Sequence, residues 1–136
     1  MSAPFDLSRI AALAASPMGQ WLGFTAVLDG DGAVYRLSFS EEHIGNPMIR
    51  ALHGGVIAAF LETAMRADLT ARLETTAAVS VVNMAIDYLA SSRAEDMQGR
   101  VRLLRLGRRV AFLEATGWQQ AENAPVAVGR ACLRIA

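Results

Sequence analysis

The sequence predicts an α+β domain in which an antiparallel sheet of five to six strands wraps around one long central helix. One segment, about residues 55–73, has the composition of a long helix and is apolar on most of its circumference. Strand-like segments joined by tight turns lie on both sides of it, a pattern typical of antiparallel rather than doubly wound sheets. No repeat or linker interrupts the 136 residues, which predicts one domain over residues 1–136.

The first half of the chain supplies a short helix and two strands. Residues 7–15 have helical composition, within an N-terminal helical segment expected over residues 1–18, and Ser16-Pro17-Met18-Gly19 ends that helix. Asp29-Gly30-Asp31-Gly32 is a strong signal for a hairpin turn. The strands that it joins cover residues 21–28 and 34–40, and a loop over residues 41–52 leads to the long helix.

The second half supplies the remaining strands. Residues 78–89 form a long strand whose even positions make a mostly apolar face, after a loop at Glu74-Thr75-Thr76. Turns at Gly107-Arg108-Arg109 and Glu122-Asn123-Ala124-Pro125 separate three further strands. These cover residues 98–106, 110–119 and 126–135.

The composition excludes several classes of function. The chain contains no lysine, which excludes Schiff-base and P-loop chemistry, and its net charge of +0 gives no general attraction to nucleic acid. One cysteine, Cys132, and two histidines are a poor set of zinc ligands, so we expect no metal. We identify no signal peptide and no apolar stretch of the ~18 residues that span a bilayer, and therefore expect a cytoplasmic protein without a membrane partner. Charged residues make up 19% of the chain, below the usual ~25%, as expected if apolar surface is hidden in an oligomer or a pocket.

The start of the long helix carries the candidate chemistry. Glu62 is the one ionisable residue in its first three turns, and a carboxylate there is costly unless it is paired or used. An ordinary ion pair with Arg66 is the structural alternative. Gly54 and Gly55 offer backbone N–H groups that can stabilise negative charge on an oxygen, unless they simply form a tight turn. For His53, a capping role is preferred to that of a general base.

Helical geometry separates the two candidate groups. Gly54 and Glu62 are eight residues apart, or ~12 Å along a helix, too far for both to act on one carbonyl. Two antiparallel central helices packed side by side would bring Gly54 of one subunit near Glu62 of the other. The spacing therefore predicts a homo-oligomer, a dimer or a dimer of dimers, whose subunits share the site.

These segments resemble the signature of hot-dog-fold acyl-CoA thioesterases of the phenylacetate-degradation type. The matching residues run from Gly45-Asn46-Pro47 through His53-Gly54-Gly55 to Glu62, nine residues after the histidine, where the family carries Asp or Glu. The resemblance continues in the later strands and turns, at Val79-Ser80-Val81, Asp87-Tyr88-Leu89 and Gly107-Arg108-Arg109. It implies a hot-dog fold and the hydrolysis of a coenzyme A thioester to a free acid and CoA.

The resemblance also implies a role for each matching residue. The Gly54 N–H would polarise the thioester carbonyl, helped by the helix dipole. Glu62 of the partner subunit would act as nucleophile or as general base for water. Asn46 would orient the water or the thioester. Ser80 resembles a water-positioning residue on the apolar face of its strand, although a small residue packed under the helix explains it equally well.

Two residues depart from the family pattern. Asn46 lies seven residues before His53, where many members have six, so its side chain can point elsewhere. Arg66 follows Glu62 by one turn, where some relatives carry a neutral residue. An ion pair there would keep Glu62 ionised, which suits a nucleophile or base rather than a general acid.

Coenzyme A brings phosphates, which this chain can meet with arginine and not with lysine. The candidates are Arg93, Arg108 and Arg109, with Gly55 and His53 beside the thioester; for arginines in turns, simple solvation is the alternative. CoA is part of the substrate, and we expect no separate cofactor. The residues that could line an acyl pocket, but more often form a core, are Trp21, Phe24, Phe60 and Met84.

Three functions are weighed. The first is an acyl-CoA thioesterase, and the second is a non-catalytic acyl-CoA-binding or ligand-sensing protein of the same fold. The third, an enoyl-CoA hydratase of this fold, would need a paired Asp and His, which His43 and His53 do not obviously form with Asp68 or Asp87. The sequence leaves the acyl group open.

Overall fold

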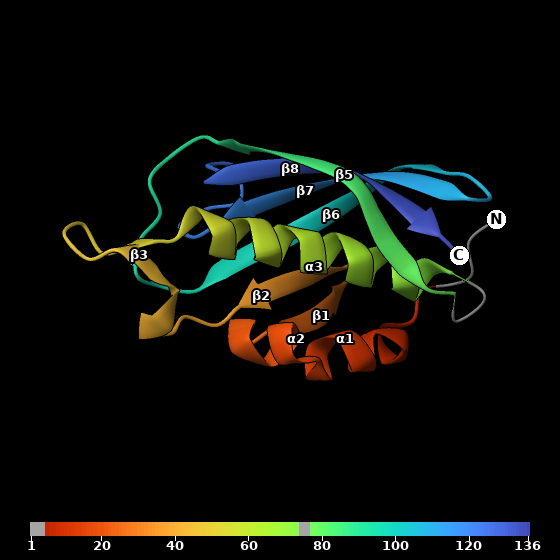
Figure 1. The fold of residues 1–136 in the computed structure, drawn as a ribbon, viewed down its shortest axis with the longest axis horizontal. Coiled ribbons are helices and arrows are strands. Elements are labelled where there is room, and N and C mark those ends of the chain that lie inside the picture. The colour runs from red at the N-terminus through yellow and green to blue at the C-terminus, as the bar shows by residue number, and fades with distance from the viewer. Residues whose placement is uncertain (1–4, 74–76) are drawn as a thin grey trace.

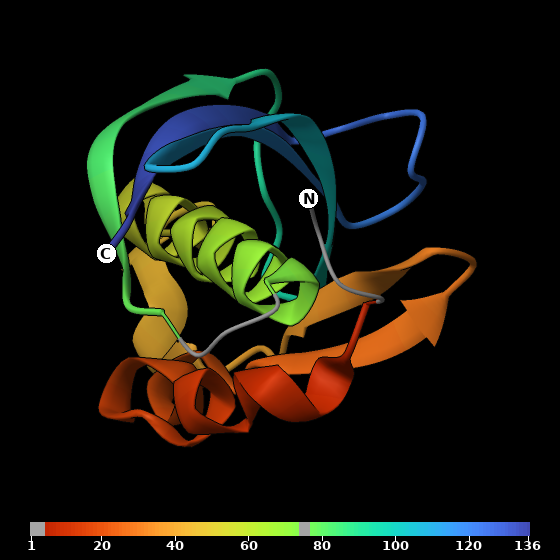
Figure 2. The same ribbon diagram turned by 90° about the vertical axis from the view of Figure 1, so that its right-hand side faces the viewer.

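The computed structural model describes residues 5–73 and 77–136, so the expected loop at Glu74-Thr75-Thr76 lies outside the described residues. One sheet of six antiparallel strands curves around helix α3 (Gly54–Arg72), and shorter N-terminal helices lie on the other side of α3 (Figure 1, Figure 2). The predicted α+β hot-dog architecture, with a sheet wrapped around one central helix, is confirmed.

The strand order places the strand that follows α3 at one edge of the sheet. The order is β1-β2-β6-β7-β8-β5, so β5 is paired with β8 alone in this sheet and the hairpin β1-β2 forms the other edge. The strands are β1 (Thr25–Asp29), β2 (Gly32–Leu37), β5 (Val79–Tyr88), β6 (Met97–Leu106), β7 (Val110–Trp118) and β8 (Ala127–Ile135). Most predicted strands are found with ends that differ by a residue or two, while the second ends at Leu37 instead of Ser40.

The N-terminal helical segment is longer than predicted. It consists of η1 (Leu7–Ile10), α1 (Ala11–Ala15) and α2 (Pro17–Leu22). Ser16 ends α1, as predicted, but its hydroxyl also accepts the Gly19 N–H and caps α2, which begins at Pro17. The prediction of a strand from Trp21 was therefore wrong, because Ser-Pro starts a helix as readily as it ends one. The chain leaves α2 through Gly23, whose φ of 60° suits glycine.

Helix α3 begins where its cap dictates. His53 has an extended backbone and its Nδ1 accepts the Gly55 N–H, so the helix starts at Gly54, one residue before the predicted start. Side chains such as Phe60, Leu61 and Met65 are fully enclosed by the surrounding elements. Each such burial contributes about 1.5–3 kcal/mol, which fixes the helix inside the sheet.

The predicted loop over residues 41–52 contains a small hairpin. It consists of η2 (Glu41–His43), β3 (Ile44–Asn46) and β4 (Ala51–Leu52). The β3–β4 register shifts between Ile44 and Asn46. Gly45 is required at this irregularity, because a Cβ there would lie 2.6 Å from the Cα of His53. The hairpin therefore packs directly against the residue that caps α3.

Strand β5 changes face at a bulge. Its register against β8 shifts between Val81 and Asn83, so the extra residue moves the inward side chains from odd to even positions. Val79 and Val81 pack against the core before the bulge, and Met84 and Ile86 do so after it. The predicted apolar face at even positions holds only beyond the bulge.

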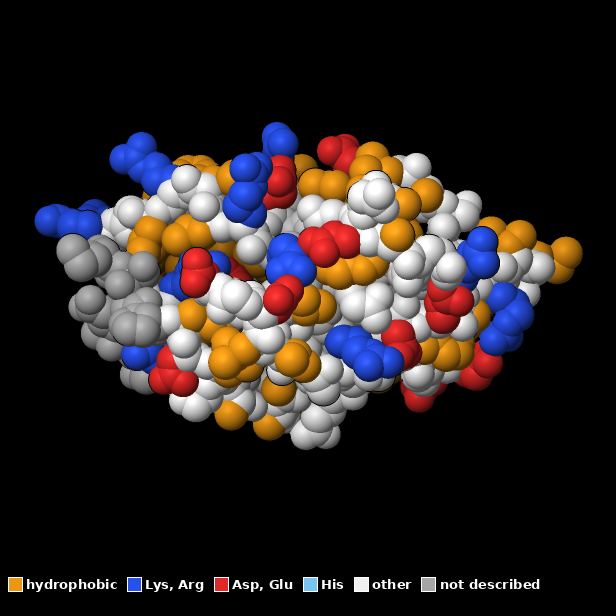
Figure 3. Space-filling model, turned by 180° about the vertical axis from the view of Figure 1, so that it is seen from behind, with side chains coloured by type: hydrophobic (Ala, Val, Ile, Leu, Met, Phe, Trp, Pro, Cys, Tyr) orange, Lys and Arg blue, Asp and Glu red, His pale blue; other side chains and the backbone are white. Residues whose placement is uncertain are grey.

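Several charged side chains of the strands form ion pairs at the surface. Arg100 bridges Asp29 and Glu122, and Glu114 accepts from both Arg102 and Arg130. On the face seen from behind, arginine and carboxylate side chains lie next to one another among apolar ones (Figure 3). Exposed pairs of this kind contribute about 0–1 kcal/mol each, so they matter more for solubility than for stability. No helix in the described part of the chain is long and apolar enough to cross a bilayer.

Candidate active site

One stripe of α3 is not covered by the sheet. It holds Gly55, Ala59, Glu62 and Arg66, which follow one another at helical spacing and are exposed or half-buried. In Figure 1, α3 lies in front of the sheet, between β5 and the N-terminal helices. This stripe is where α3 can meet a substrate or a second subunit.

The two glycines at the start of α3 use their N–H groups differently. The Gly55 N–H donates to Nδ1 of His53 at 2.8 Å, which is the capping role preferred for this histidine. Within residues 5–73 and 77–136, no hydrogen-bond acceptor is found for the Gly54 N–H. The helix therefore presents one unpaired N–H at the positive end of its dipole.

Tyr88, which was not among the predicted site residues, ties this helix start to the sheet. Its hydroxyl donates to the Gly54 carbonyl at 2.7 Å, and its ring lies against the Gly54 Cα, since an added Cβ would meet it at 3.4–3.6 Å. The end of β5 thereby holds the first turn of α3. The sequence offered no signal for this contact beyond the presence of a tyrosine at a strand end.

Glu62 forms the ion pair that was weighed against a catalytic role, but it forms it loosely. Its Oε2 lies 3.8 Å from Nη1 of Arg66, and 37% of the Glu62 side chain is exposed. The pair engages one carboxylate oxygen and leaves the other accessible. The Nε of Arg66 is buried without a hydrogen-bond partner in the part of the chain that the structure describes.

Asn46 is bonded within its own turn, and Ser80 lies far along its strand from the start of α3. The Asn46 Oδ1 accepts the Met48 N–H at 3.1 Å, so the side chain helps to close the turn of the β3–β4 hairpin. Ser80 was predicted on the apolar face of its strand; this was wrong, because the bulge places its exposed side chain on the opposite face. Ser80 also lies eight residues along β5 from Tyr88, which contacts the start of α3; this is ~26 Å of extended strand.

The candidate phosphate-binding arginines lie at opposite ends of the sheet. Arg93 follows Ser92, whose hydroxyl accepts the Leu52 N–H at 3.0 Å, so this loop lies beside the start of α3. Arg108 and Arg109 form the β6–β7 turn, where the Arg109 carbonyl accepts the Ile135 N–H. This turn lies at the far ends of β6 and β8, and one subunit therefore brings Arg93 alone of the three toward Gly54.

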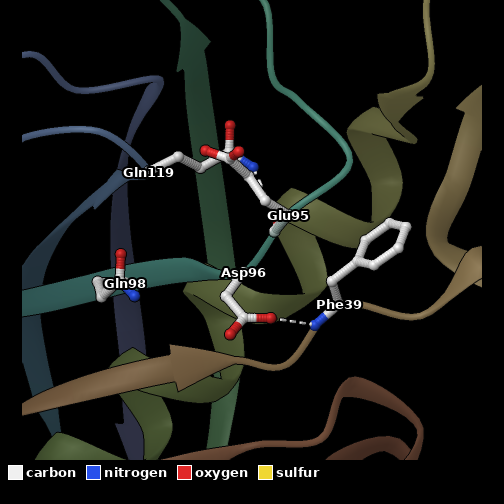
Figure 4. A pocket seen from close by; sticks show the side chains of 5 residues that line it. All are labelled: Phe39, Glu95, Asp96, Gln98 and Gln119. Carbon is white, nitrogen blue, oxygen red and sulfur yellow. Dashed lines mark hydrogen bonds between the residues drawn. The ribbon is translucent and has the colours of Figure 1, made fainter.

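A hollow of about 430 Å³ lies away from α3. It is lined by Phe39, Glu95, Asp96, Gln98 and Gln119 (Figure 4). The Asp96 carboxylate accepts the Phe39 N–H at 2.7 Å and pairs with Arg36, and both bonds hold its pKa below the usual range. Gln119 is likewise bonded to the backbone of neighbouring residues. The main polar groups that line this hollow are already hydrogen-bonded within the protein, so the hollow offers few partners to a ligand.

A second hollow, of about 350 Å³, opens beside the start of α3. Its lining residues come from α2, η2, β3 and α3: Met18, Trp21, Glu42, Ile44, His53, Gly55, Val56 and Ala59. Of the four residues weighed for an acyl pocket, Trp21 alone lines it, whereas Phe24 and Phe60 belong to the core. We refer to this hollow as the α2 groove.

The Asp–His pair that a hydratase would need is not formed by the residues considered for it. His43 is buried, with Nδ1 accepting the Ser40 N–H and Nε2 bonded to the Trp21 carbonyl. Asp68 is bonded to Tyr35 and Arg72. Both groups are therefore engaged in structural contacts elsewhere.

Comparisons with known proteins agree with this geometry. No curated protein matches the chain. A phenylacetic acid degradation-related protein from Ralstonia eutropha is 25% identical, with a TM-score of 0.80 over 94% of this chain and 98% of that one. A thioesterase from Haemophilus influenzae (21% identical, TM-score 0.84, 98% and 92% covered) and a Bacillus halodurans protein solved with CoA (18% identical, TM-score 0.79, 90% and 80% covered) share the fold.

A family model extends the comparison from the fold to the sequence. The model for the acyl-CoA thioesterase N-terminal domain matches residues 43–134. That range includes Asn46, the cap at His53, both glycines and Glu62, and it spans most of the chain. The chain therefore belongs to the acyl-CoA thioesterase family.

Proposed function

We propose that this protein hydrolyses an acyl-CoA thioester to a free acid and CoA, in a homodimer whose subunits share the active site. The observation that carries the proposal is the unpaired Gly54 N–H at the start of a helix whose exposed stripe also presents Glu62. A structural relative binds CoA, which supports CoA as the leaving group. Acyl-CoA binding without turnover is the alternative.

The distance between Gly54 and Glu62 along α3 is the reason for proposing a site shared by two subunits. Gly54 and Glu62 are eight residues apart on α3, or ~12 Å. Antiparallel packing of two α3 helices would place each Gly54 opposite Glu62 of the partner subunit. One further observation supports such packing, because the edge of β5 that faces away from β8 is unpaired in this sheet.

The chemistry needs a polarised carbonyl and a carboxylate. The Gly54 N–H would donate to the thioester oxygen and stabilise the negative charge that develops on it. Glu62 of the partner subunit would then take a proton from the attacking water, or attack the carbonyl itself to form an anhydride that water hydrolyses. In either course the C–S bond breaks and CoA leaves as a thiolate that is protonated.

The remaining predicted residues would come from both subunits. Ser80 follows Val79, which lines a small hollow with Arg66 and Thr70. In the proposed dimer, Ser80 would come from the subunit that supplies Glu62, and Asn46 from the subunit that supplies Gly54. For Ser80 and Asn46 the support is the family resemblance.

The same arrangement would gather arginines from two subunits around the CoA phosphates. Arg93 lies at the Gly54 end of its own subunit. Arg108 and Arg109 lie at the other end, near the C-terminus of α3. In an antiparallel dimer that end of the partner subunit lies beyond the start of α3, so its β6–β7 turn would face the departing CoA.

The test removes the N–H without removing the helix. Proline is tolerated in the first turn of a helix, and the extended backbone of His53 suits a residue before proline. We expect Gly54→Pro to lower kcat about 10²–10³-fold, whereas Gly54→Ala, which keeps the N–H, retains most turnover. Equal activity of the two variants would contradict the role of this N–H.

Mixed dimers test the sharing of the site. Heterodimers of Gly54→Pro with Glu62→Ala contain one intact site if each site takes Gly54 from one subunit and Glu62 from the other. We expect recovery of up to about half of the wild-type rate per heterodimer. No recovery, with heterodimers verified by mass spectrometry, would count against the shared site. Binding of acyl-CoA by the wild type without release of thiol would instead support the non-catalytic alternative.

A further inference from the structure

We propose that the α2 groove is the acyl subsite, that it takes a neutral apolar acyl group, and that Trp21 sets which chain lengths fit. This inference rests on the proposed function, since the acyl group is that of a thioester held at Gly54. The groove measures about 350 Å³, within the ~300–1,000 Å³ typical of small-molecule sites.

The groove begins beside the Gly54 N–H, which is proposed to bind the thioester oxygen, and extends away from it along α3. His53 and Gly55, which flank the unpaired Gly54 N–H, both line it, and Ala59 continues it one turn along the exposed stripe of α3. Gly55 has no side chain and therefore leaves this part of the groove open. A Cβ added there would lie 3.0 and 3.1 Å from ring atoms of His53. A thioester whose carbonyl is held by Gly54 can therefore extend its acyl group over Gly55 and Ala59.

The negative charge in the groove indicates that it binds the acyl part of the substrate and not the CoA part. Among the described side chains that line it, Glu42 is the one charged residue and none is an arginine. A carboxylate repels the phosphates of CoA, which the arginines outside the groove suit better. Glu42 also disfavours acyl groups that end in a carboxylate, so the groove favours a neutral acyl group.

The wall formed by α2 is apolar and held in place. Met18 and Trp21 stay 48% and 40% exposed, which leaves large apolar side chains facing the groove. His43 fixes the end of α2, because its Nδ1 accepts the Ser40 N–H and its Nε2 therefore donates to the Trp21 carbonyl at 2.9 Å. The Trp21 ring also packs edge-on against the His43 ring, with centroids 4.6 Å apart. A wall fixed in this way orders little on binding, which favours affinity.

The experiment measures kcat/KM for acetyl-, butanoyl-, hexanoyl- and octanoyl-CoA by thiol release. We expect kcat/KM of the wild type to rise by up to ~4-fold per added methylene until the groove is filled.

Trp21→Ala removes the wall and Ala59→Phe fills the floor, and both should lower the octanoyl-to-acetyl ratio of kcat/KM at least ~10-fold. Phe112→Ala, on a side chain that is similarly exposed at 42%, is the matched control and should keep the wild-type ratio. Glu42→Gln should raise the rate with succinyl-CoA relative to butanoyl-CoA.

A binding measurement separates this proposal from the proposed function. S-octyl-CoA and S-methyl-CoA are thioethers that cannot be hydrolysed, and their affinities are measured by calorimetry. Tighter binding of S-octyl-CoA by the wild type, lost in Trp21→Ala and Ala59→Phe, supports the groove even if no thioester is hydrolysed. Hydrolysis with unchanged chain-length ratios in both variants overturns the groove and leaves the proposed function standing. Dissociation of the Ala59→Phe dimer, with a wild-type ratio in Trp21→Ala, would show that a second copy of the chain fills the groove, and would also overturn the proposal.

Discussion

Two pairs of an acidic residue and an arginine lie four residues apart on α3, one pair in the middle of the helix and one at its C-terminal end, and their environments are opposite. Glu62 precedes Arg66 by four residues, and their charged atoms lie 3.8 Å apart with 37% of the Glu62 side chain exposed. Asp68 precedes Arg72 by four residues, but here the distance is 2.7 Å and the Asp68 side chain is 1% exposed. Local helical geometry is equal for both pairs, so the surroundings make the difference.

At the C-terminal end the polar groups satisfy one another within the protein. Asp68 accepts from Arg72 and from the buried hydroxyl of Tyr35, at 2.8 Å. Burial raises the pKa of Asp68, and burial together with the neighbouring Asp68 carboxylate raises the pKa of Tyr35. The Arg72 guanidinium also lies over the ring of Phe5, which joins the N-terminal segment to this cluster. This end of α3 serves the fold.

In the first half of α3 the polar groups are left available. The Gly54 N–H finds no acceptor in the described ranges 5–73 and 77–136, and the Glu62 carboxylate is only loosely paired. The comparison teaches that an (i, i+4) ion pair in a sequence does not reveal whether its carboxylate stabilises the fold or remains free for chemistry.

The largest expected effect is the loss of turnover in Glu62→Gln. The substitution keeps the shape of the side chain and removes the carboxylate, so kcat should fall about 10²–10⁴-fold. The free energy of unfolding should stay within about 0.5 kcal/mol, because the side chain is half-exposed. Thiol release and urea unfolding check both values, with Glu122→Gln as an exposed control. A folded Glu62→Gln protein with wild-type kcat would mean that the Glu62–Arg66 pair has a structural role, as the Asp68–Arg72 pair does.

The corresponding experiment on the second pair removes the buried carboxylate of Asp68. Asp68→Ala leaves Tyr35 and Arg72 without their acceptor and should lower the free energy of unfolding by about 3–5 kcal/mol. Tyr35→Phe, which keeps the Asp68–Arg72 pair, should cost less, about 0.5–1.5 kcal/mol. The folded fraction of each should retain kcat/KM within a few-fold. An Asp68→Ala protein that unfolds at the wild-type urea midpoint would refute the structural role of this cluster.

Tyr88→Phe tests how much the sheet contributes to the start of α3. The ring stays in place and the bond to the Gly54 carbonyl is lost, which should lower kcat about 2–10-fold, since such a bond contributes about 0.5–1.5 kcal/mol. KM should change less, because the ring contact remains. The readout is the separation of kcat from KM, and an unchanged kcat would show that the His53 cap holds this turn without help.

The smallest effect concerns pH. Because the pKa of Asp68 is raised by burial from its ordinary 3.8, the folded chain holds this proton more tightly than the unfolded chain. Its stabilising contribution is fully present below about pH 3.8 and is lost as the pH rises through the folded-state pKa. As the pH falls toward 3.8, the wild type should therefore gain stability relative to Asp68→Asn. A difference between the two that is independent of pH would contradict the raised pKa.

Much of the fold could be predicted from local patterns. The long helix, the hairpin turn before β2 and the strands after α3 follow from helical composition, glycine-rich turns and alternation, which depend on neighbours in the sequence. The missed helix α2 shows the limit, since Ser16 and Pro17 carry a signal that both ends and starts a helix. Ser80 shows another limit, because one extra residue at the β5 bulge reverses the face of every position before it.

The sequence by itself determined which residues are candidates. Gly54, Glu62 and the arginines stand out because residue type and spacing limit what they can do, and the distance between Gly54 and Glu62 follows from helical rise alone. The tertiary structure decided which candidates are available. It bonded the Gly55 N–H to His53 and buried Asp68, and it left the Gly54 N–H and Glu62 accessible. The reason is that burial and hydrogen bonding depend on contacts between segments far apart in the chain, which no local pattern encodes.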